Sequence, residues 1–164
     1  MTTWKSDAVK AGLMPDYSRA GVVLCRTGVY YTDAQDEIVS GDTIQMVPIP
    51  KNAQILDVVI TAKLLAGTLA FEGASGCHVG DGACPSRFMD DASLGNAIML
   101  CIVDDGRPAS IGYTYDEGED TIDIAVKKAA TVNQTYTTII MNVYYKMAGS
   151  ISDEDLQTYN AAAG

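Results

Sequence analysis

The side chains best suited to nucleophilic or metal chemistry in this chain are a single histidine, His78, and four cysteines. His78 directly follows Cys77, so a cysteine nucleophile with a neighbouring general base is the first chemistry to consider. Adjacent residues of a strand point to opposite faces, however, which keeps the two side chains apart. A zinc site would need His78 with three of the cysteines, and their separations match no compact zinc motif. We therefore interpret His78 as a loop residue and most of the cysteines as small buried apolar groups.

Carboxylates are the other candidate ligands or catalysts. They gather at Asp116, Glu117, Glu119 and Asp120, and in the pairs Asp90-Asp91 and Asp104-Asp105. None of these groups has the spacing of a calcium-binding loop. Two carboxylates can hydrolyse a glycoside, but nothing in the sequence sets a pair of them across a cleft. The sequence predicts no catalytic residue, no metal ligand and no cofactor, and we expect the protein not to be an enzyme.

The overall composition narrows the class of partner. The formal net charge is −10, and proteins that bind nucleic acid need Lys and Arg to neutralise phosphates, so a nucleic-acid partner is not expected. Hydrophobic residues make up 48% of the chain, enough for one domain with a buried core. No apolar run approaches the ~20 residues that span a bilayer, and residues 1–18 lack the apolar core of a secretion signal. We expect no membrane partner, and synthesis in a cytoplasm.

Two segments have the alternation of half-buried strands. In residues 55–64 one face is predicted to hold Leu56, Val58, Ile60, Ala62 and Leu64, and in residues 137–147 one face is predicted to hold Ile139, Met141, Val143, Tyr145 and Met147. Residues 111–115 and 121–126 flank the acidic stretch 116–120 and predict a β-hairpin with an acidic tip. Strands this short and this closely spaced favour an all-β antiparallel sandwich or barrel.

Three further segments are β-rich but less regular. Residues 21–31 predict a strand interrupted between Arg26 and Gly28. Residues 38–50 end in Pro48 and Pro50, which lack backbone donors and predict an edge strand or an extended crossing. Residues 97–103 are a continuous apolar run, typical of a strand buried on both faces. Cys77 and Cys84 flank a turn, and we expect them to pair only in an oxidising medium.

The two ends of the chain are predicted to be extended arms. We assign residues 1–18 to an N-terminal arm, 19–148 to the β-sandwich core and 149–164 to a C-terminal arm. Apolar groups on terminal segments tend to find a neighbouring chain. The candidate interface residues are Trp4, Leu13, Met14, Tyr17, Leu156 and Tyr159.

Three short sequences, in this order, resemble a known protein family. They are residues 47–56 (VPIPKNAQIL), residues 80–88 (GDGACPSRF), and residues 112–115 (GYTY) followed by 122–124 (IDI). This order is similar to that of small virion proteins of tailed bacteriophages, especially the head decoration or cement proteins. The resemblance covers about residues 40–147.

The resemblance implies a β-sandwich or jelly-roll-like core that assembles as a homotrimer on the capsid exterior. The implied function is to bind the major capsid protein of the mature icosahedral head and to stabilise the contacts between its subunits. The alternative is a low-copy tail, fibre or receptor-binding virion protein, for which exposed Tyr113, Tyr115 and Tyr136 would matter. An enzyme is the third alternative.

Overall fold

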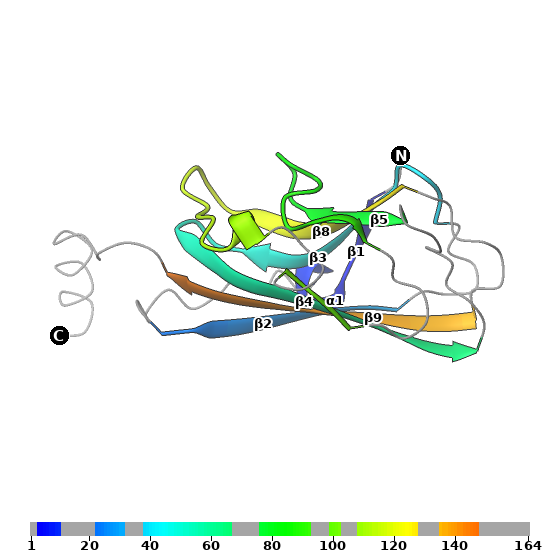
Figure 1. Cartoon of the computed structure of the whole chain (residues 1–164). Helices are drawn as coiled ribbons and strands as arrows, with labels where there is room; N and C mark the ends of the chain where they lie inside the picture. The colour runs from blue at the N-terminus through cyan, green and yellow to red at the C-terminus, as the bar shows by residue number, and fades with distance from the viewer. Residues whose placement is uncertain are drawn as a thin grey trace, which may run out of the picture.

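The fold consists of two β-sheets stacked face to face (Figure 1). The structure, a computed structural model, describes residues 3–10, 22–31, 38–66, 76–92, 99–102, 108–127 and 135–147. Sheet A has five strands in the order β1-β3-β8-β5-β6, and sheet B has four strands in the order β2-β9-β4-β7. The predicted all-β sandwich is confirmed. All strand pairs in the described residues are antiparallel except β1 with β3, which is parallel.

The strands of the two sheets differ in length. Sheet A contains β1 (Thr3–Lys5), β3 (Thr43–Ile49), β8 (Asp120–Val126), β5 (Cys77–Gly80) and β6 (Met89–Ala92). Sheet B contains β2 (Leu24–Tyr31), β9 (Thr135–Met147), β4 (Ala53–Ala66) and β7 (Met99–Cys101). Two short helical turns complete the described elements, α1 (Asp7–Lys10) and a 3-10 turn, η1 (Pro108–Ser110).

The longest pair, β4 with β9, is the centre of sheet B. Its ladder runs from Ala53 opposite Met147 to Ala66 opposite Thr135. The predicted buried faces are largely correct, because Val58, Ile60 and Ala62 on β4 are buried, as are alternate residues of β9. Leu56 does not follow the prediction, since a register shift between Ile55 and Asp57 buries Ile55 instead, and the side chain of Leu64 lies outside the described residues. A bulge inserts one residue and reverses the alternation on its far side.

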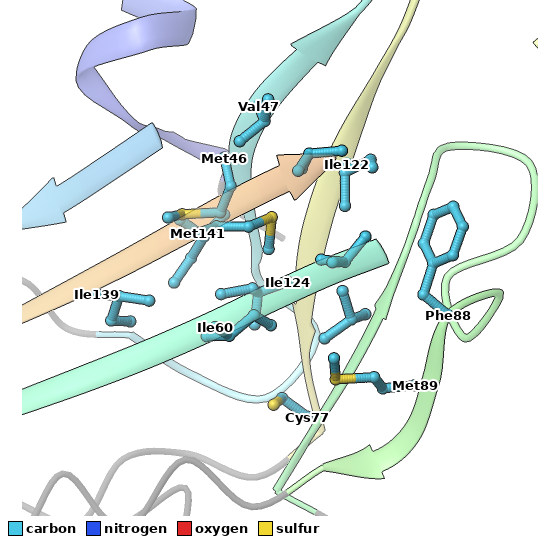
Figure 2. Close-up of a cluster of buried hydrophobic side chains, with 14 of the residues drawn as sticks. Met46, Val47, Ile60, Cys77, Phe88, Met89, Ile122, Ile124, Ile139 and Met141 are labelled. Carbon is cyan, nitrogen blue, oxygen red and sulfur yellow. The ribbon is translucent and has the colours of Figure 1, made fainter. Parts of the chain in front are cut away.

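The hydrophobic core lies between the two sheets (Figure 2). Branched aliphatic and methionine side chains of both layers interdigitate there. The residues labelled in Figure 2 are Ile60, Ile139 and Met141 from sheet B, Met46, Val47, Cys77, Met89, Ile122 and Ile124 from sheet A, and Phe88 from the segment that leads into β6. Alternating strand residues supply this layer, which explains why strand periodicity was a good guide to the core.

The two sheets approach most closely where β2 crosses β3. A Cβ placed on Gly28 would overlap the backbone carbonyl of Met46. The register of β3 shifts between Gln45 and Val47, so Met46 lies in a bulge, and its carbonyl accepts a hydrogen bond from the Ser6 hydroxyl. The predicted interruption of this strand at residues 26–28 is wrong. β2 is continuous, and Gly28 is there because another backbone comes close.

The predicted acidic-tipped hairpin is also wrong. Both edges of β8 are occupied by β3 and β5, and residues 112–115 run instead beside the start of β4. Ile55 N–H donates to Tyr113 O (2.9 Å), and Tyr115 N–H donates to Ala53 O (3.0 Å). Alternation identified a buried face on residues 111–115 but could not identify the strand that lies next to it.

Two other segments differ from the prediction in their position within a sheet. Residues 99–101 of the apolar run form β7, which is the outermost described strand of sheet B rather than a strand within it. β3 is flanked by β1 and β8, but β1 pairs only with residues 43–45. Pro48 therefore lies on a part of β3 that has one described neighbour, where a missing donor is tolerated.

Residues 3–10 of the predicted N-terminal arm lie against sheet A and β2. Trp4 pairs in register with Ile44, packs against the core, and donates from Nε1 to Asp42 Oδ2 (3.3 Å). Asp7 on α1 accepts a hydrogen bond from Val29 N–H on β2 (2.8 Å). The rest of that arm and all of residues 149–164 lie outside the described residues. No helix in the described ranges is long and apolar enough to cross a membrane.

Candidate functional site

The most elaborate polar site is built around residues 81–88, which we name the Asp81 loop. The loop leaves the end of β5 and folds back over it, so that Phe88 N–H donates to Val79 O (2.9 Å). A Cβ on Gly80 would collide with the Cys84 carbonyl, which explains the glycine at this position. Phe88 is fully buried and anchors the far end of the loop in the core.

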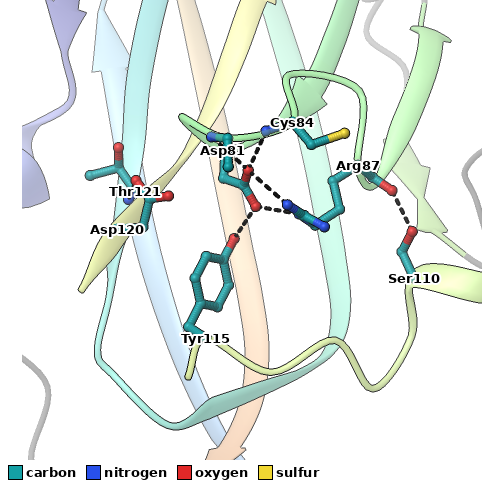
Figure 3. A network of polar contacts seen from close by, with 8 residues as sticks. Asp81, Cys84, Arg87, Ser110, Tyr115, Asp120 and Thr121 are labelled. Carbon is teal, nitrogen blue, oxygen red and sulfur yellow. Dashed lines mark hydrogen bonds and ion pairs between the residues drawn. The ribbon is translucent and has the colours of Figure 1, made fainter. Parts of the chain in front are cut away.

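Asp81 is the centre of this site (Figure 3). It is 2% exposed, and its Oδ1 accepts hydrogen bonds from the backbone N–H groups of Ala83 (3.1 Å) and Cys84 (2.7 Å). The guanidinium of Arg87 donates to both carboxylate oxygens, and the Tyr115 hydroxyl donates to Oδ2 (3.0 Å). The carboxylate is thus both neutralised and saturated with donors, as a buried charge requires.

Two tyrosines and a serine extend the site. Arg87 lies over the Tyr113 ring, 3.8 Å from its centroid, and Tyr113 meets Tyr115 edge to face at 5.1 Å. Ser110 donates to the Arg87 carbonyl, which ties η1 to the loop. Burial lowers the pKa of Arg87, but the hydrogen bond and charge of Asp81 outweigh this effect and the pKa is raised. Burial also raises the pKa of Tyr115, so its hydroxyl remains a proton donor to Asp81.

An acidic rim borders the Asp81 loop. Together with Asp81, Ala83, Tyr113, Tyr115 and Gly118, the rim residues Asp116, Glu117, Glu119 and Asp120 line an open hollow of about 250 Å³. We name these four residues the acidic lip. The lip was predicted as the tip of a hairpin, but the structure shows it as the edge of this hollow.

The contacts of the site hold the Asp81 loop in place. Asp81 accepts five hydrogen bonds from four residues, so its carboxylate has no oxygen left without a donor. The predicted separation of Cys77 and His78 is confirmed, but the prediction that His78 is a loop residue is wrong, since it lies in β5 opposite Ala125. Cys77 is buried in the core, where burial raises the pKa of its thiol to about 12, and His78 Nδ1 pairs instead with Asp90 Oδ1 at 2.6 Å. The four cysteines form no disulfide. Within the described ranges, no three His, Cys, Asp or Glu side chains gather as a metal site requires.

One buried carboxylate lies close to the loop without the partners that Asp81 has. Asp123 on β8 is 6% exposed, and its Oδ1 has no hydrogen-bond partner. Its register neighbours are Gln45 on β3 and Gly80 on β5. Burial raises the pKa of Asp123 to about 7, the Thr121 hydrogen bond opposes this, and the charges of Asp120 and Asp81 add to it.

Of the six candidate interface residues, the structure describes only Trp4. Its side chain is half-buried against the chain's own core. Leu13, Met14, Tyr17, Leu156 and Tyr159 lie outside the described residues, so their role as interface residues stays a prediction.

The Asp81 network was not predicted from the sequence. The segment 80–88 was noted only for its resemblance, and no role was given to Asp81 or Arg87. The available signal was an Asp-Gly pair two residues before Cys84, because aspartate readily accepts hydrogen bonds from the backbone N–H groups that follow it. The contribution of Tyr115 from a distant segment had no local signal.

Comparison with known proteins gives a fold but no family. No protein-family model matches the sequence, and no curated protein sequence matches it. Solved structures of similar fold include a chain of "Cyanophage Pam1 capsid asymmetric unit", with a TM-score of 0.58 and 18% identity over 82% of this chain and 91% of that chain. Another is a chain of "Capsid of Ralstonia phage GP4", with a TM-score of 0.62 and 17% identity over 90% of this chain and 99% of that chain. At this identity the similarity shows a shared fold.

Proposed function

We propose that the protein is a structural component of a phage virion. The observation that supports this most is the similarity of fold to chains of two phage capsid structures, which extends over nearly the whole length of those chains. The similarity therefore concerns nearly the whole of those chains rather than a part of them. The sequence resemblance to decoration proteins points in the same direction and rests on short sequence motifs rather than on the fold.

Within this class, the role we favour is that of a decoration or cement protein on the exterior of the head. Such a protein binds the assembled lattice better than separate or ruptured subunits, and this difference in affinity stabilises the closed shell. Assembly as a homotrimer would let one particle touch several major capsid subunits, so that modest contacts become collectively strong. The acidic surface keeps the free protein soluble at the high concentration that such a role demands.

The alternative of a receptor-binding tail or fibre protein depended on exposed aromatic rings, and the structure shows that two of them are covered. Its aromatic surface was expected to include Tyr113 and Tyr115. Tyr115 is 5% exposed and Tyr113 is stacked between Arg87 and Tyr115. Tyr115 is thus too buried to receive a ligand face to face, and Arg87 covers one face of Tyr113. The side chain of Tyr136 lies outside the described residues.

The measurement that tests the proposal is quantitative mass spectrometry of purified virions that contain this chain. A copy number close to that of the major capsid protein is expected for a cement protein. A handful of copies per particle would assign the chain to a tail or vertex, and absence from particles would overturn the virion role altogether.

A further inference from the structure

The outer surface of sheet B differs in character from the rest of the molecule. Sheet B forms the lower layer in Figure 1, and no described element lies on its outer side. We name this surface the sheet B face. Its outward residues whose side chains the structure describes are Cys25, Thr27, Val29 and Tyr31 on β2; Thr138, Ile140, Asn142, Tyr144 and Lys146 on β9; Asp57, Val59 and Thr61 on β4; and Cys101 on β7.

Charge is almost absent from the sheet B face. The chain carries 21 acidic residues, yet Asp57 is the one carboxylate among the outward residues just named. Its Oδ1 is occupied by the N–H groups of Val58 (2.8 Å) and Ile102 (3.2 Å). Lys146 is the one cation among them, and it lies at the same end of the face as Asp57. The middle of the face presents β-branched residues and a hydrogen-bonded pair, Thr27 Oγ1 to Asn142 Oδ1 (2.6 Å).

The opposite side of the sandwich is charged. On the outer side of sheet A, Lys5 and Asp90 are exposed, and His78 is paired with Asp90. The acidic lip borders the same layer. Among the described residues, the sheet B face therefore carries few charges, with Asp57 as its one carboxylate, and the acidic lip borders the opposite layer.

A partner would meet the sheet B face rather than extend the sheet from the β2 edge. The exposed edge of a sheet invites another strand, but Asp7 of α1 already accepts the Val29 N–H on the outer edge of β2. Side chains on the flat face have no such cover within the described residues. Contact through the face is thus the mode of association that this sheet leaves open.

The size of the sheet B face suits a contact that is repeated many times. Four strands ~4.8 Å apart, over eight residues of ~3.3 Å each, give roughly 500 Å². A stable interface buries about 800 Å² on each partner. One copy would bind weakly through this face alone, whereas a regular lattice engages many copies, or several faces of one oligomer, at once.

We infer that the sheet B face is the surface that lies against the viral shell, and that its partner there is a flat, weakly charged protein surface. This inference rests on the proposed virion function. In this orientation the acidic lip and the Asp81 loop point away from the shell. The carboxylates of the acidic lip then stay in water, and the contact avoids the cost of burying unpaired charges.

The natural cysteines provide one test. Cys25 is exposed on the sheet B face, and Cys84 lies in the Asp81 loop on the other layer. Free protein and virions would be treated with iodoacetamide, and modification of each cysteine followed by mass spectrometry. We expect modification of Cys25 to slow by roughly tenfold or more on the particle while modification of Cys84 stays within about twofold. Equal rates for Cys25 in both forms would overturn the inference.

Matched charge insertions provide the second test. Thr27→Glu adds a carboxylate to the sheet B face, and Thr43→Glu adds the same group to the outer side of sheet A. Each variant would be tested for folding by circular dichroism and for rebinding to particles stripped of the wild-type protein. An uncompensated charge in a contact is costly, so Thr27→Glu is expected to weaken rebinding roughly 30-fold or more while Thr43→Glu rebinds like wild type.

The outcomes separate the inference from the function on which it rests. If wild type does not rebind at all, the cement role fails and the inference fails with it. If wild type and both variants rebind equally, the cement role stands and the choice of face is wrong. If the free protein is an oligomer that Thr27→Glu dissociates, a second copy occupies the face and the inference is overturned.

Discussion

Asp81, just after the end of β5, and Asp123, on the neighbouring β8, are both buried carboxylates, but they differ in their hydrogen bonding. Asp81 has a guanidinium, a hydroxyl and two backbone donors. Asp123 has an oxygen with no partner at all. A buried charge with full hydrogen bonding is tolerated, whereas one without it shifts its pKa toward the neutral form. The two residues therefore predict different responses to substitution.

Replacing Asp123 should remove a pH-dependent loss of stability. Because its folded pKa is about 7 and its reference pKa 3.8, the folded state retains a proton that the unfolded state releases between these values. The free energy of unfolding of wild type then falls, relative to Asp123→Asn, as pH rises from about 4 to 7, and the difference is constant above. At ~1.4 kcal/mol per pKa unit, the difference reaches about 4 kcal/mol at most.

Urea unfolding of both proteins at several pH values between 4 and 8.5 measures this difference. The groups around Asp123 are Asp120 and Thr121 on β8, Gln45 on β3, Lys5 on β1, and Asp81 and His78 on the side of β5. Asp116→Asn, which removes one carboxylate from the exposed lip, is the control variant. A difference between Asp123→Asn and wild type that does not change with pH would contradict the prediction.

Replacing Asp81 should loosen its loop. Asp81→Asn keeps an oxygen that can accept the Ala83 and Cys84 N–H groups but leaves the Arg87 charge unpaired. Breaking a buried ion pair costs ~3–5 kcal/mol, and partial exposure of Arg87 brings the expected loss to about 2–3 kcal/mol. Asp81→Ala, which loses both kinds of contact, should cost more.

The readouts are the free energy of unfolding and the rate at which Cys84 is alkylated in the folded protein. Both variants should accelerate alkylation of Cys84 while Cys77, in the core, stays unreactive. If stability falls and Cys84 reactivity is unchanged, the pair stabilises the sandwich without ordering the loop.

For the strands, the sequence predicted well which face of a strand is buried, but it predicted poorly which strands lie next to each other. The alternation in β4 and β9 depends on local residue order, and it predicted Ile60, Ala62 and Met141 as core residues correctly. The choice of neighbouring strand depends on contacts distant in sequence, so residues 111–115 were assigned to β8 although they lie against β4. The Leu56 bulge was missed for a related reason, since both Ile55 and Leu56 are apolar and either could face the core.

In the candidate site, too, the contacts join residues that are distant in sequence and that local residue order does not bring together. Asp81, Arg87 and Tyr115 come from two segments whose proximity follows from the fold as a whole. Trp4 was predicted as an interface residue, and the contact that the structure shows is with the chain's own core.

The crossing of β2 and β3 predicts a large effect from a small substitution. Gly28→Ala would force a methyl group into the Met46 carbonyl oxygen and to 2.9 Å from its carbon. Backbone cannot move aside as a side chain tip can, so the loss should be at least ~2–3 kcal/mol. Gly118→Ala is the matched control, because nothing lies within 4 Å of its added Cβ.

Thermal or urea unfolding of the two alanine variants gives the comparison. Gly118→Ala should unfold within about 0.5 kcal/mol of wild type, as surface substitutions usually do. Equal stability of Gly28→Ala and wild type would mean that the two sheets can separate locally without cost.

For the whole molecule, charge is the dominant surface property. With a net charge of −10 and an acidic lip of four carboxylates at one end, mutual repulsion opposes the folded state at low ionic strength. Salt shortens the Debye length from ~30 Å at 0.01 M to ~8 Å at 0.15 M. The melting temperature should therefore rise by a few degrees between these two salt concentrations.

Differential scanning calorimetry checks this expectation. Glu117→Lys with Glu119→Lys changes the net charge by +4, to −6, and should reduce the salt effect. A melting temperature that falls with salt would show that attractive pairs such as Arg87 with Asp81 outweigh the repulsion.

The long ladder between β4 and β9 also determines how the molecule responds to mechanical load. Its hydrogen bonds lie perpendicular to the strands, and the two strands stay paired from one end of sheet B to the other. Tension applied along the strands must shear all of these bonds together, whereas tension across the sheet would open them one after another. We therefore expect the force needed to unfold this protein to be highest when it is pulled along β4 and β9.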